Sequence, residues 1–84
     1  MGDKAFTMDE VAKHNTGSDC WVVIDNNVYD VTNFLSEHPG GKRAIVSYAG
    51  KNATEQFYMM HRPDVIKKYG PEFKIGTVPG SAKL

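Results

Sequence analysis

The 84-residue chain has a single cysteine, no long hydrophobic run and no excess of charge of either sign. With Cys20 alone, no disulfide can form within the chain. The longest apolar runs, such as Trp21-Val22-Val23-Ile24, are far shorter than the roughly 20 residues that a membrane-spanning helix needs. Ten basic residues balance ten acidic ones, which argues against nucleic acid or an anionic membrane as the main partner. We therefore expect a soluble protein without a membrane anchor.

The length predicts one small domain whose core is only marginally stable by itself. Such domains gain stability from a disulfide, a metal or a cofactor, and the disulfide is already excluded. Cys20, next to Trp21, is interpreted as a small buried hydrophobic residue rather than a reactive thiol. Residues 1–80 are predicted to form the domain, and residues 81–84 a tail or the start of a linker.

The first half of the chain predicts a helix followed by a β-hairpin. Thr7 and Glu10 form a capping-box pattern at the start of a helix over residues 8–13, after a short edge strand at Phe6-Thr7. Strands are expected over residues 21–24 and 28–31, joined by a turn at residues 25–27. Period-2 alternation puts Tyr29 and Val31 on one face. Thr32 is expected to cap a helical turn over residues 33–37.

The second half predicts short helices and a closing strand. A helix over residues 42–49 ends at Gly50, and the next helix is capped by Asn52 or Thr54. Pro63 fits the first position of a helix over residues 64–69, which Gly70-Pro71 should stop, and residues 73–78 alternate like a strand. The predicted fold class is α+β: a small mixed sheet under short helices that form a pocket.

Two histidines frame the most distinctive stretch. His38 begins the turn His38-Pro39-Gly40-Gly41, and His61 follows 23 positions later, on the same predicted helix side as Phe57 and Met60. Either histidine alone could be a core residue bonded to a backbone carbonyl. Together, opposed across an apolar slot, they favour haem iron with both axial positions filled. His14 is expected to be solvated or to cap a helix, and Met59 and Met60 are expected to fill the core rather than bind metal.

The motifs of the chain resemble those of the cytochrome b5 family over about residues 6–80. The resemblance implies a cytochrome b5-like fold that holds haem b (iron protoporphyrin IX) non-covalently, with His38 and His61 as the iron ligands. It also implies a pocket lined by Val31, Phe34, Leu35, Ile45, Phe57, Met60, Ile66 and Tyr69. The matching segments are Asp19-Cys20-Trp21-Val22-Val23-Ile24, Val28-Tyr29-Asp30-Val31-Thr32, Phe34-Leu35, Glu37-His38-Pro39-Gly40-Gly41, Ala49-Gly50, Ala53-Thr54 and Phe57.

In short segments, the sequence is most similar to the haem domain of flavocytochrome b2, the fungal L-lactate dehydrogenase, notably at residues 11–15, 19–24 and 61–69. The chain departs from the microsomal members at Lys42-Arg43, where they carry acidic residues, and at Arg62, where they carry serine. The acidic docking ring of those members is therefore not expected here. Arg62, Lys67 or Tyr69 is expected to contact a haem propionate, because a cation or phenol can form a charge-assisted bond there.

The resemblance implies an electron-transfer protein, an electron carrier rather than an enzyme on its own, that acts between a flavin-containing reductase or dehydrogenase and a redox acceptor protein. We expect a monomer. The sequence leaves its compartment open between the cytoplasm and the mitochondrial intermembrane space. Two alternatives stay open. The domain could be the haem relay of a larger oxidoreductase, or it could be a non-redox haem or ligand-binding module of the same fold.

Overall fold

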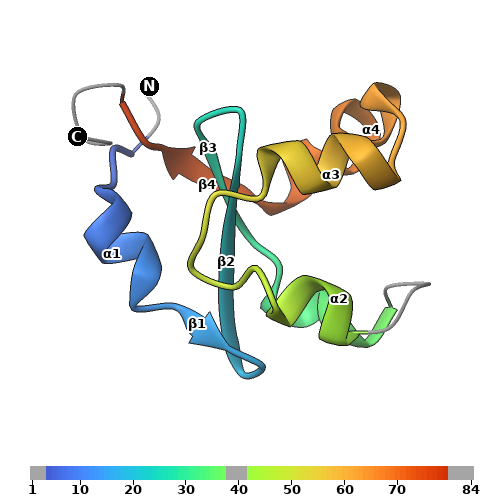
Figure 1. Ribbon diagram of the computed structural model, residues 1–84. Helices are drawn as coiled ribbons and strands as arrows, with labels where there is room; N and C mark the ends of the chain where they lie inside the picture. Colours follow the sequence, from blue (N-terminus) through green and yellow to red (C-terminus); the bar gives the residue numbers. More distant parts are fainter. Residues whose placement is uncertain (1–3, 38–41, 80–84) are drawn as a thin grey trace.

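A four-stranded sheet forms the centre of the computed structural model, which describes residues 4–37 and 42–79 (Figure 1). Its strands follow one another in chain order, and each pairs antiparallel with the next. Two isolated parallel bridges, Ala5 with Thr77 and Val23 with Asn52, tie further segments to the sheet. The predicted α+β class is confirmed. The strands are β1 (Asn15–Thr16), β2 (Asp19–Ile24), β3 (Asn27–Asp30) and β4 (Lys74–Thr77).

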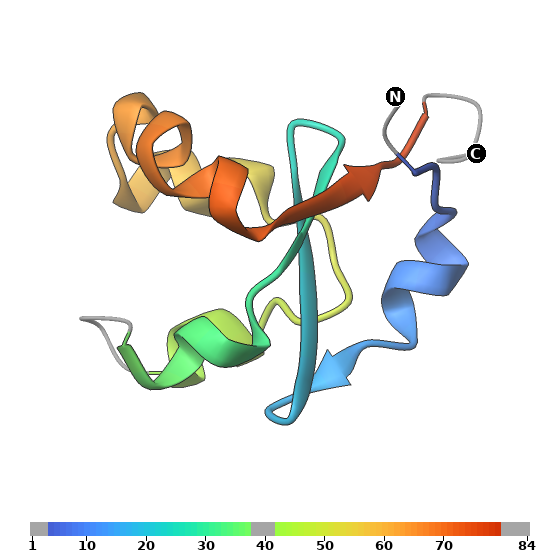
Figure 2. The ribbon, with the colours of Figure 1, turned by 180° about the vertical axis from the view of Figure 1, so that it is seen from behind.

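In the part of the chain that the structure describes, five short helical segments surround the sheet. Figures 1 and 2, which view the molecule from opposite sides, both place α1 on one side of β2 and the helices α2, α3 and α4 on the other. The segments are α1 (Met8–Ala12), the 3-10 helix η1 (Thr32–Glu37), α2 (Lys42–Val46), α3 (Thr54–Met60) and α4 (Pro63–Phe73).

Two separate apolar clusters lie on the two faces of the hairpin. Alternate residues of a strand point to opposite faces, so β2 sends Val23 to one cluster and Val22 with Ile24 to the other. The α1 side is closed around Val23 and Val28, which are both fully buried. The opposite cluster contains Cys20, Val22, Ile24, Tyr29, Val31, Leu35, Ala49 and Ala53.

The predicted hairpin is confirmed, and its turn is tight. Ile24 pairs with Asn27, so the turn itself consists of Asp25 and Asn26, with φ angles of 52° and 67°. Two-residue hairpin turns with both central φ angles positive match the twist of the strands, and Asp and Asn tolerate this conformation better than most residues. β3 begins one residue earlier than predicted and ends at Asp30, before Val31.

The capping box at α1 is also confirmed. The Glu10 backbone N–H donates to Thr7 Oγ1 at 3.1 Å, and the Thr7 N–H donates to Glu10 Oε1 at 3.0 Å. These reciprocal bonds satisfy two of the backbone donors that the first turn of a helix leaves unpaired. Before this helix, the expected edge strand is reduced to the bridge at Ala5 and a bond from the Phe6 N–H to the Thr77 carbonyl at 2.8 Å.

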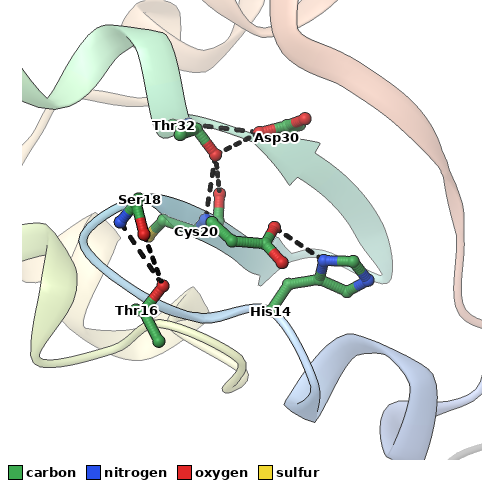
Figure 3. Close-up of polar contacts among 7 residues, drawn as sticks. His14, Thr16, Ser18, Cys20, Asp30 and Thr32 are labelled. Carbon is green, nitrogen blue, oxygen red and sulfur yellow. Dashed lines mark hydrogen bonds and ion pairs between the residues drawn. The ribbon is translucent and has the colours of Figure 1, made fainter.

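Thr32 does not cap the segment that follows it, contrary to the prediction. Its hydroxyl accepts from the Cys20 N–H at 2.9 Å and donates to Asp30 Oδ1 at 2.7 Å, as Figure 3 shows. The Asp30 carboxylate also accepts from the Thr32 N–H at 3.2 Å. The Thr32 side chain therefore connects the start of η1 to the hairpin, and the Asp30 carboxylate satisfies the backbone N–H of Thr32.

His14 does not cap the helix, and its side chain is only 29% exposed because it packs against the sheet. Its ring stacks on the Trp21 indole with centroids 3.5 Å apart and planes 8° apart, and its Nδ1 lies 2.7 Å from Asp19 Oδ1 (Figure 3). The imidazole joins the end of α1 to the β1–β2 hairpin. The prediction failed because nothing local in the sequence indicates that the chain folds back to place Trp21 against this ring.

The stop predicted at Gly70-Pro71 is wrong, since α4 continues to Phe73. Pro71 lacks an N–H and so removes one helical hydrogen bond, but the Lys74 N–H still donates to the Gly70 carbonyl and closes the last turn. A Cβ on Gly70 would lie 3.2 Å from Tyr29 Cε1. Here glycine lets the helix pass close to the sheet rather than ending it.

The two preceding helices also differ from expectation. α2 ends at Val46, and residues 47–50 continue as turns up to Gly50, which has a φ of 74°. α3 is preceded by Ala53 without a side-chain cap, and Asn52 Oδ1 accepts from the Thr54 N–H at 3.1 Å instead. The His38-Pro39-Gly40-Gly41 turn and the tail at 81–84 lie outside the described residues. Within the described ranges, no helix is both long and apolar enough to cross a bilayer.

Cys20 is fully buried, as predicted, and this makes stability sensitive to alkaline pH. Burial raises the pKa of its thiol from 9.0 to about 11, with smaller contributions from the Asp30 and Asp19 carboxylates. Because the pKa is higher in the folded chain, this contribution to stability is complete below pH 9 and is lost as the pH rises to about 11. The unfolding free energy, measured by urea titration, should fall across this interval, and less steeply in Cys20→Ala. Equal slopes in both proteins would contradict this.

Candidate functional site

A cavity of about 1070 Å³ lies between the sheet and the helices on the side opposite α1. Figure 1 shows its frame: α2 lies on one side, α3 and α4 on the other, and the hairpin β2–β3 at the inner end. Ordinary small-molecule pockets have volumes of roughly 300–1,000 Å³, so this cavity can accept a large planar cofactor.

The lining is apolar and aromatic. None of the described residues that line the cavity is Asp, Glu, Lys or Arg. Val22 and Ile24 of β2 form the inner wall, and the rings of Phe34 and Phe73, with centroids 5.2 Å apart, join η1 to α4. A site of this kind excludes water and accepts a predominantly hydrophobic ligand.

His61 lies at the end of α3, half-buried and in the cavity lining. Its backbone is extended, with φ −135° and ψ 152°, so it follows the helix instead of sharing a helical side with Phe57 and Met60. The ring stacks on Phe57 with centroids 4.6 Å apart and planes 11° apart, and Nδ1 is 3.1 Å from the Phe57 carbonyl oxygen. A carbonyl oxygen only accepts hydrogen bonds, so Nδ1 carries the proton and Nε2 of the neutral ring carries the lone pair.

Most of the predicted site residues line this cavity. Leu35 instead lies in the adjoining core, 3% exposed. The Arg62 side chain is not part of the lining and is 89% exposed, with Nε 3.9 Å from Asp64 Oδ1. His38 lies outside the described residues. The predicted residues in the lining are Val31, Phe34, Ile45, Phe57, Met60, His61, Ile66 and Tyr69.

Several lining residues were not predicted. Tyr29 is 6% exposed, and burial raises the pKa of its phenol. The period-2 rule already placed it beside Val31, so the signal was present. Phe73 was missed because the helix was expected to stop at Gly70. Met59 and Met60 are 81% and 79% exposed, which contradicts the expectation that they fill the core. The others not predicted are Val22, Ile24, Ala44, Ser47, Tyr48, Ala53, Gln56, Val65 and Gly70.

Comparison with known proteins identifies the family of the chain that forms this cavity. Residues 7–79 match the family described as Cytochrome b5-like Heme/Steroid binding domain. The chain belongs to this family. Cytochrome b5 domains bind haem b and generally transfer electrons, so haem b is the cofactor against which the cavity must be judged.

Individual relatives agree with this assignment. Cytochrome b5 of Drosophila melanogaster is 49% identical over 84 residues, which cover 95% of this chain and 60% of the fly protein. L-lactate dehydrogenase (cytochrome) of Saccharomyces cerevisiae is 50% identical over 82 residues, covering 96% of this chain and 14% of the enzyme. The solved structure of cytochrome b5 of Ostreococcus tauri virus 2 aligns with a TM-score of 0.81 at 57% identity, over 87% of this chain and 94% of the viral one. The chain thus spans only part of the fly and yeast proteins.

The described residues fit a haem of the cytochrome b5 type. The cavity is large, and its described lining is uncharged, as the apolar macrocycle requires. His61 contributes an imidazole whose lone pair lies on the ring nitrogen not bonded to Phe57. A metal-binding histidine usually donates its other ring N–H to a carbonyl or carboxylate, as His61 does.

Proposed function

We propose that this domain carries electrons by means of haem b held between His38 and His61. It would receive electrons from a flavin-containing reductase or dehydrogenase and pass them to a redox acceptor protein, as a monomeric carrier rather than an enzyme on its own. Residues 1–80 would form the haem-binding unit. The observation that carries the proposal is the His61 imidazole, bonded through Nδ1 to the Phe57 carbonyl at the edge of an uncharged cavity.

The residues of the chain have distinct tasks in this proposal. His38 and His61 would hold the haem iron, which supplies a one-electron redox couple when bound. The Phe57 ring holds the His61 ring by stacking, and the Phe57 carbonyl accepts a hydrogen bond from its Nδ1–H. The wall formed by Val22, Ile24 and Phe73 keeps water from the cavity interior, which tunes the reduction potential.

Relatives support the choice of partners. The yeast relative whose segment matches this chain is named a dehydrogenase, which favours a dehydrogenase as electron donor, either tethered or diffusing. Redox encounters use small interfaces, so the contact with either partner should be brief. The alternative is a non-redox binding module, since the family description also includes steroids and an apolar cavity of this size suits such a ligand.

Absorption spectra of the purified protein titrated with haem distinguish these functions. We expect a low-spin spectrum when oxidised and split visible bands when reduced, with loss of the low-spin form in His38→Ala. A reduced flavoprotein should then reduce the loaded protein. Failure of the wild-type chain to take up haem would reject the electron-transfer proposal and favour the binding module.

Replacement of Arg62 tests whether a side chain at the outer edge of the site contacts a haem propionate. It directly follows His61, but its side chain is 89% exposed. We therefore expect a solvent-screened contact, so that Arg62→Ala speeds haem loss to apomyoglobin by no more than about fivefold, the equivalent of a surface ion pair. Tyr69→Phe is the matched test inside the lining. If Arg62→Ala changes neither the rate of haem loss nor the midpoint potential, Arg62 has no part in the site.

A further inference from the structure

The helix that presents His61 is weakly anchored by apolar packing. α3 spans Thr54–Met60, and none of its side chains is fully buried. Phe57 and Tyr58 are half-buried, whereas Met59 and Met60 are largely exposed. Packing alone therefore leaves this helix less constrained than the hairpin beneath it. Other contacts must fix where its C-terminal end, and thus His61, lies.

The β2–β3 turn makes such contacts through Asp25. The Asp25 carboxylate accepts a hydrogen bond from the Tyr58 hydroxyl, and the Asp25 backbone N–H donates to Thr54 Oγ1 at 2.9 Å. Thr54 in turn donates its hydroxyl proton to Asn52 Oδ1 at 2.6 Å. One residue of the turn thus holds both the first residue and the middle of α3.

The turn is itself a firm support. Asp25 and Asn26 form a two-residue connection between paired strands, and both have positive φ angles, so the backbone that carries the Asp25 side chain is held in place. The chain just before α3 is also attached to β2. The Ala53 N–H donates to the Val23 carbonyl at 2.7 Å, and the Val23 N–H donates to the Lys51 carbonyl at 3.1 Å.

Tyr58 is the neighbour of the residue that orients His61. The Phe57 carbonyl accepts both from the His61 backbone N–H at 2.8 Å and from its Nδ1 at 3.1 Å. The rings of Phe57 and Tyr58 meet edge to face with centroids 5.2 Å apart. A constraint on the Tyr58 hydroxyl therefore restrains the rotation of α3 about its axis, and with it the direction of the Phe57 carbonyl and ring.

We propose that Asp25 is a positioning residue for His61 and acts through the hydroxyl of Tyr58. The importance of Asp25 for haem binding rests on the proposed function, whereas the effect of Asp25 on the position of α3 does not. The bond to the carboxylate also raises the pKa of Tyr58 to about 12, because it favours the protonated phenol that donates it.

Tyr58→Phe is the sharpest test because it removes one oxygen and keeps the ring. In the haem-free protein, we expect the backbone amides of Phe57 and His61 to exchange with deuterium about threefold to tenfold faster, the loss of roughly one hydrogen bond. In the haem-loaded protein, we expect haem transfer to apomyoglobin to accelerate by a similar factor. Asp25→Asn, which retains an acceptor and tolerates the positive φ, should give an intermediate result.

Thr7→Ala is the matched control, since it removes a comparable hydrogen bond in the capping box of α1, on the other side of the sheet. It should lower global stability without a selective effect on the Phe57 and His61 amides or on haem loss. The proposal is overturned if Tyr58→Phe leaves both rates unchanged, or if Thr7→Ala changes them equally. Should the wild-type chain bind no haem, the proposed function fails while amide exchange still decides the role of Asp25.

Discussion

Replacement of His61 with alanine should abolish the low-spin haem form. The variant loses the imidazole at the cavity edge and, with it, the bond from Nδ1 to the Phe57 carbonyl. Loss of a residue that merely orients a metal ligand typically weakens metal binding about 10-fold to 100-fold, so loss of the proposed ligand itself should weaken haem binding by at least about 100-fold. Haem titration followed by absorption spectroscopy measures both the affinity and the spin state.

His14→Ala provides the control for this experiment. It removes an imidazole of the same size that is also partly buried, but on the α1 side, where it stacks on Trp21. We expect this variant to lose some stability and to keep the low-spin spectrum. A low-spin spectrum in His61→Ala with wild-type affinity would show that a side chain other than His61 binds the iron.

Gly76→Ala should be the most destabilising single-methyl change in the described part of the sheet. A Cβ on Gly76 would lie 2.3 Å from the Lys4 carbonyl oxygen and 2.6 Å from Phe6 Cε2. Since the first contact is with backbone, the N-terminal segment must move and its bonds to Thr77 must weaken. We expect a loss of about 3 kcal/mol, at the upper end of what overpacking usually costs. Urea unfolding followed by tryptophan fluorescence measures it.

Gly17→Ala is the appropriate comparison, because nothing lies within 4 Å of the Cβ it would add. A surface change of this kind should alter the unfolding free energy by less than about 0.5 kcal/mol. If the two alanine variants unfold at the same urea concentration, the N-terminal segment does not pack on β4 as described.

The parts of the fold that were predictable depend on short-range chemistry. The capping box needs only Thr7 and Glu10 three residues apart, and the hairpin needs two apolar segments and a turn of Asp and Asn. The errors occurred where distant segments meet. Gly70 was interpreted as a stop signal because the sequence does not show that Tyr29 lies against it. His14 was misassigned for the same reason, since its partner Trp21 reaches it through the β1–β2 hairpin.

For the site, the sequence indicated the candidate histidine, His61, better than it indicated the contacts around this histidine. His61 was selected from its spacing and its apolar neighbours, and the structure places it in the lining of a large cavity. Its orientation could not be predicted, because it depends on an extended backbone after α3 and on the carbonyl of Phe57. The role suggested for Asp25 was also invisible, since 33 residues separate it from Tyr58 in the chain.

The division of the interior into two clusters affects how such a protein is assembled. The cluster around Val23 and Val28 is closed by α1 and by Val78, and none of its buried members lines the cavity. Because none of these side chains lines the cavity, we expect this half to form without haem. We expect the helices around the cavity to become fully ordered only when the cofactor is bound. Limited proteolysis of the haem-free chain should therefore cut first between α2 and α4, and haem should close those sites.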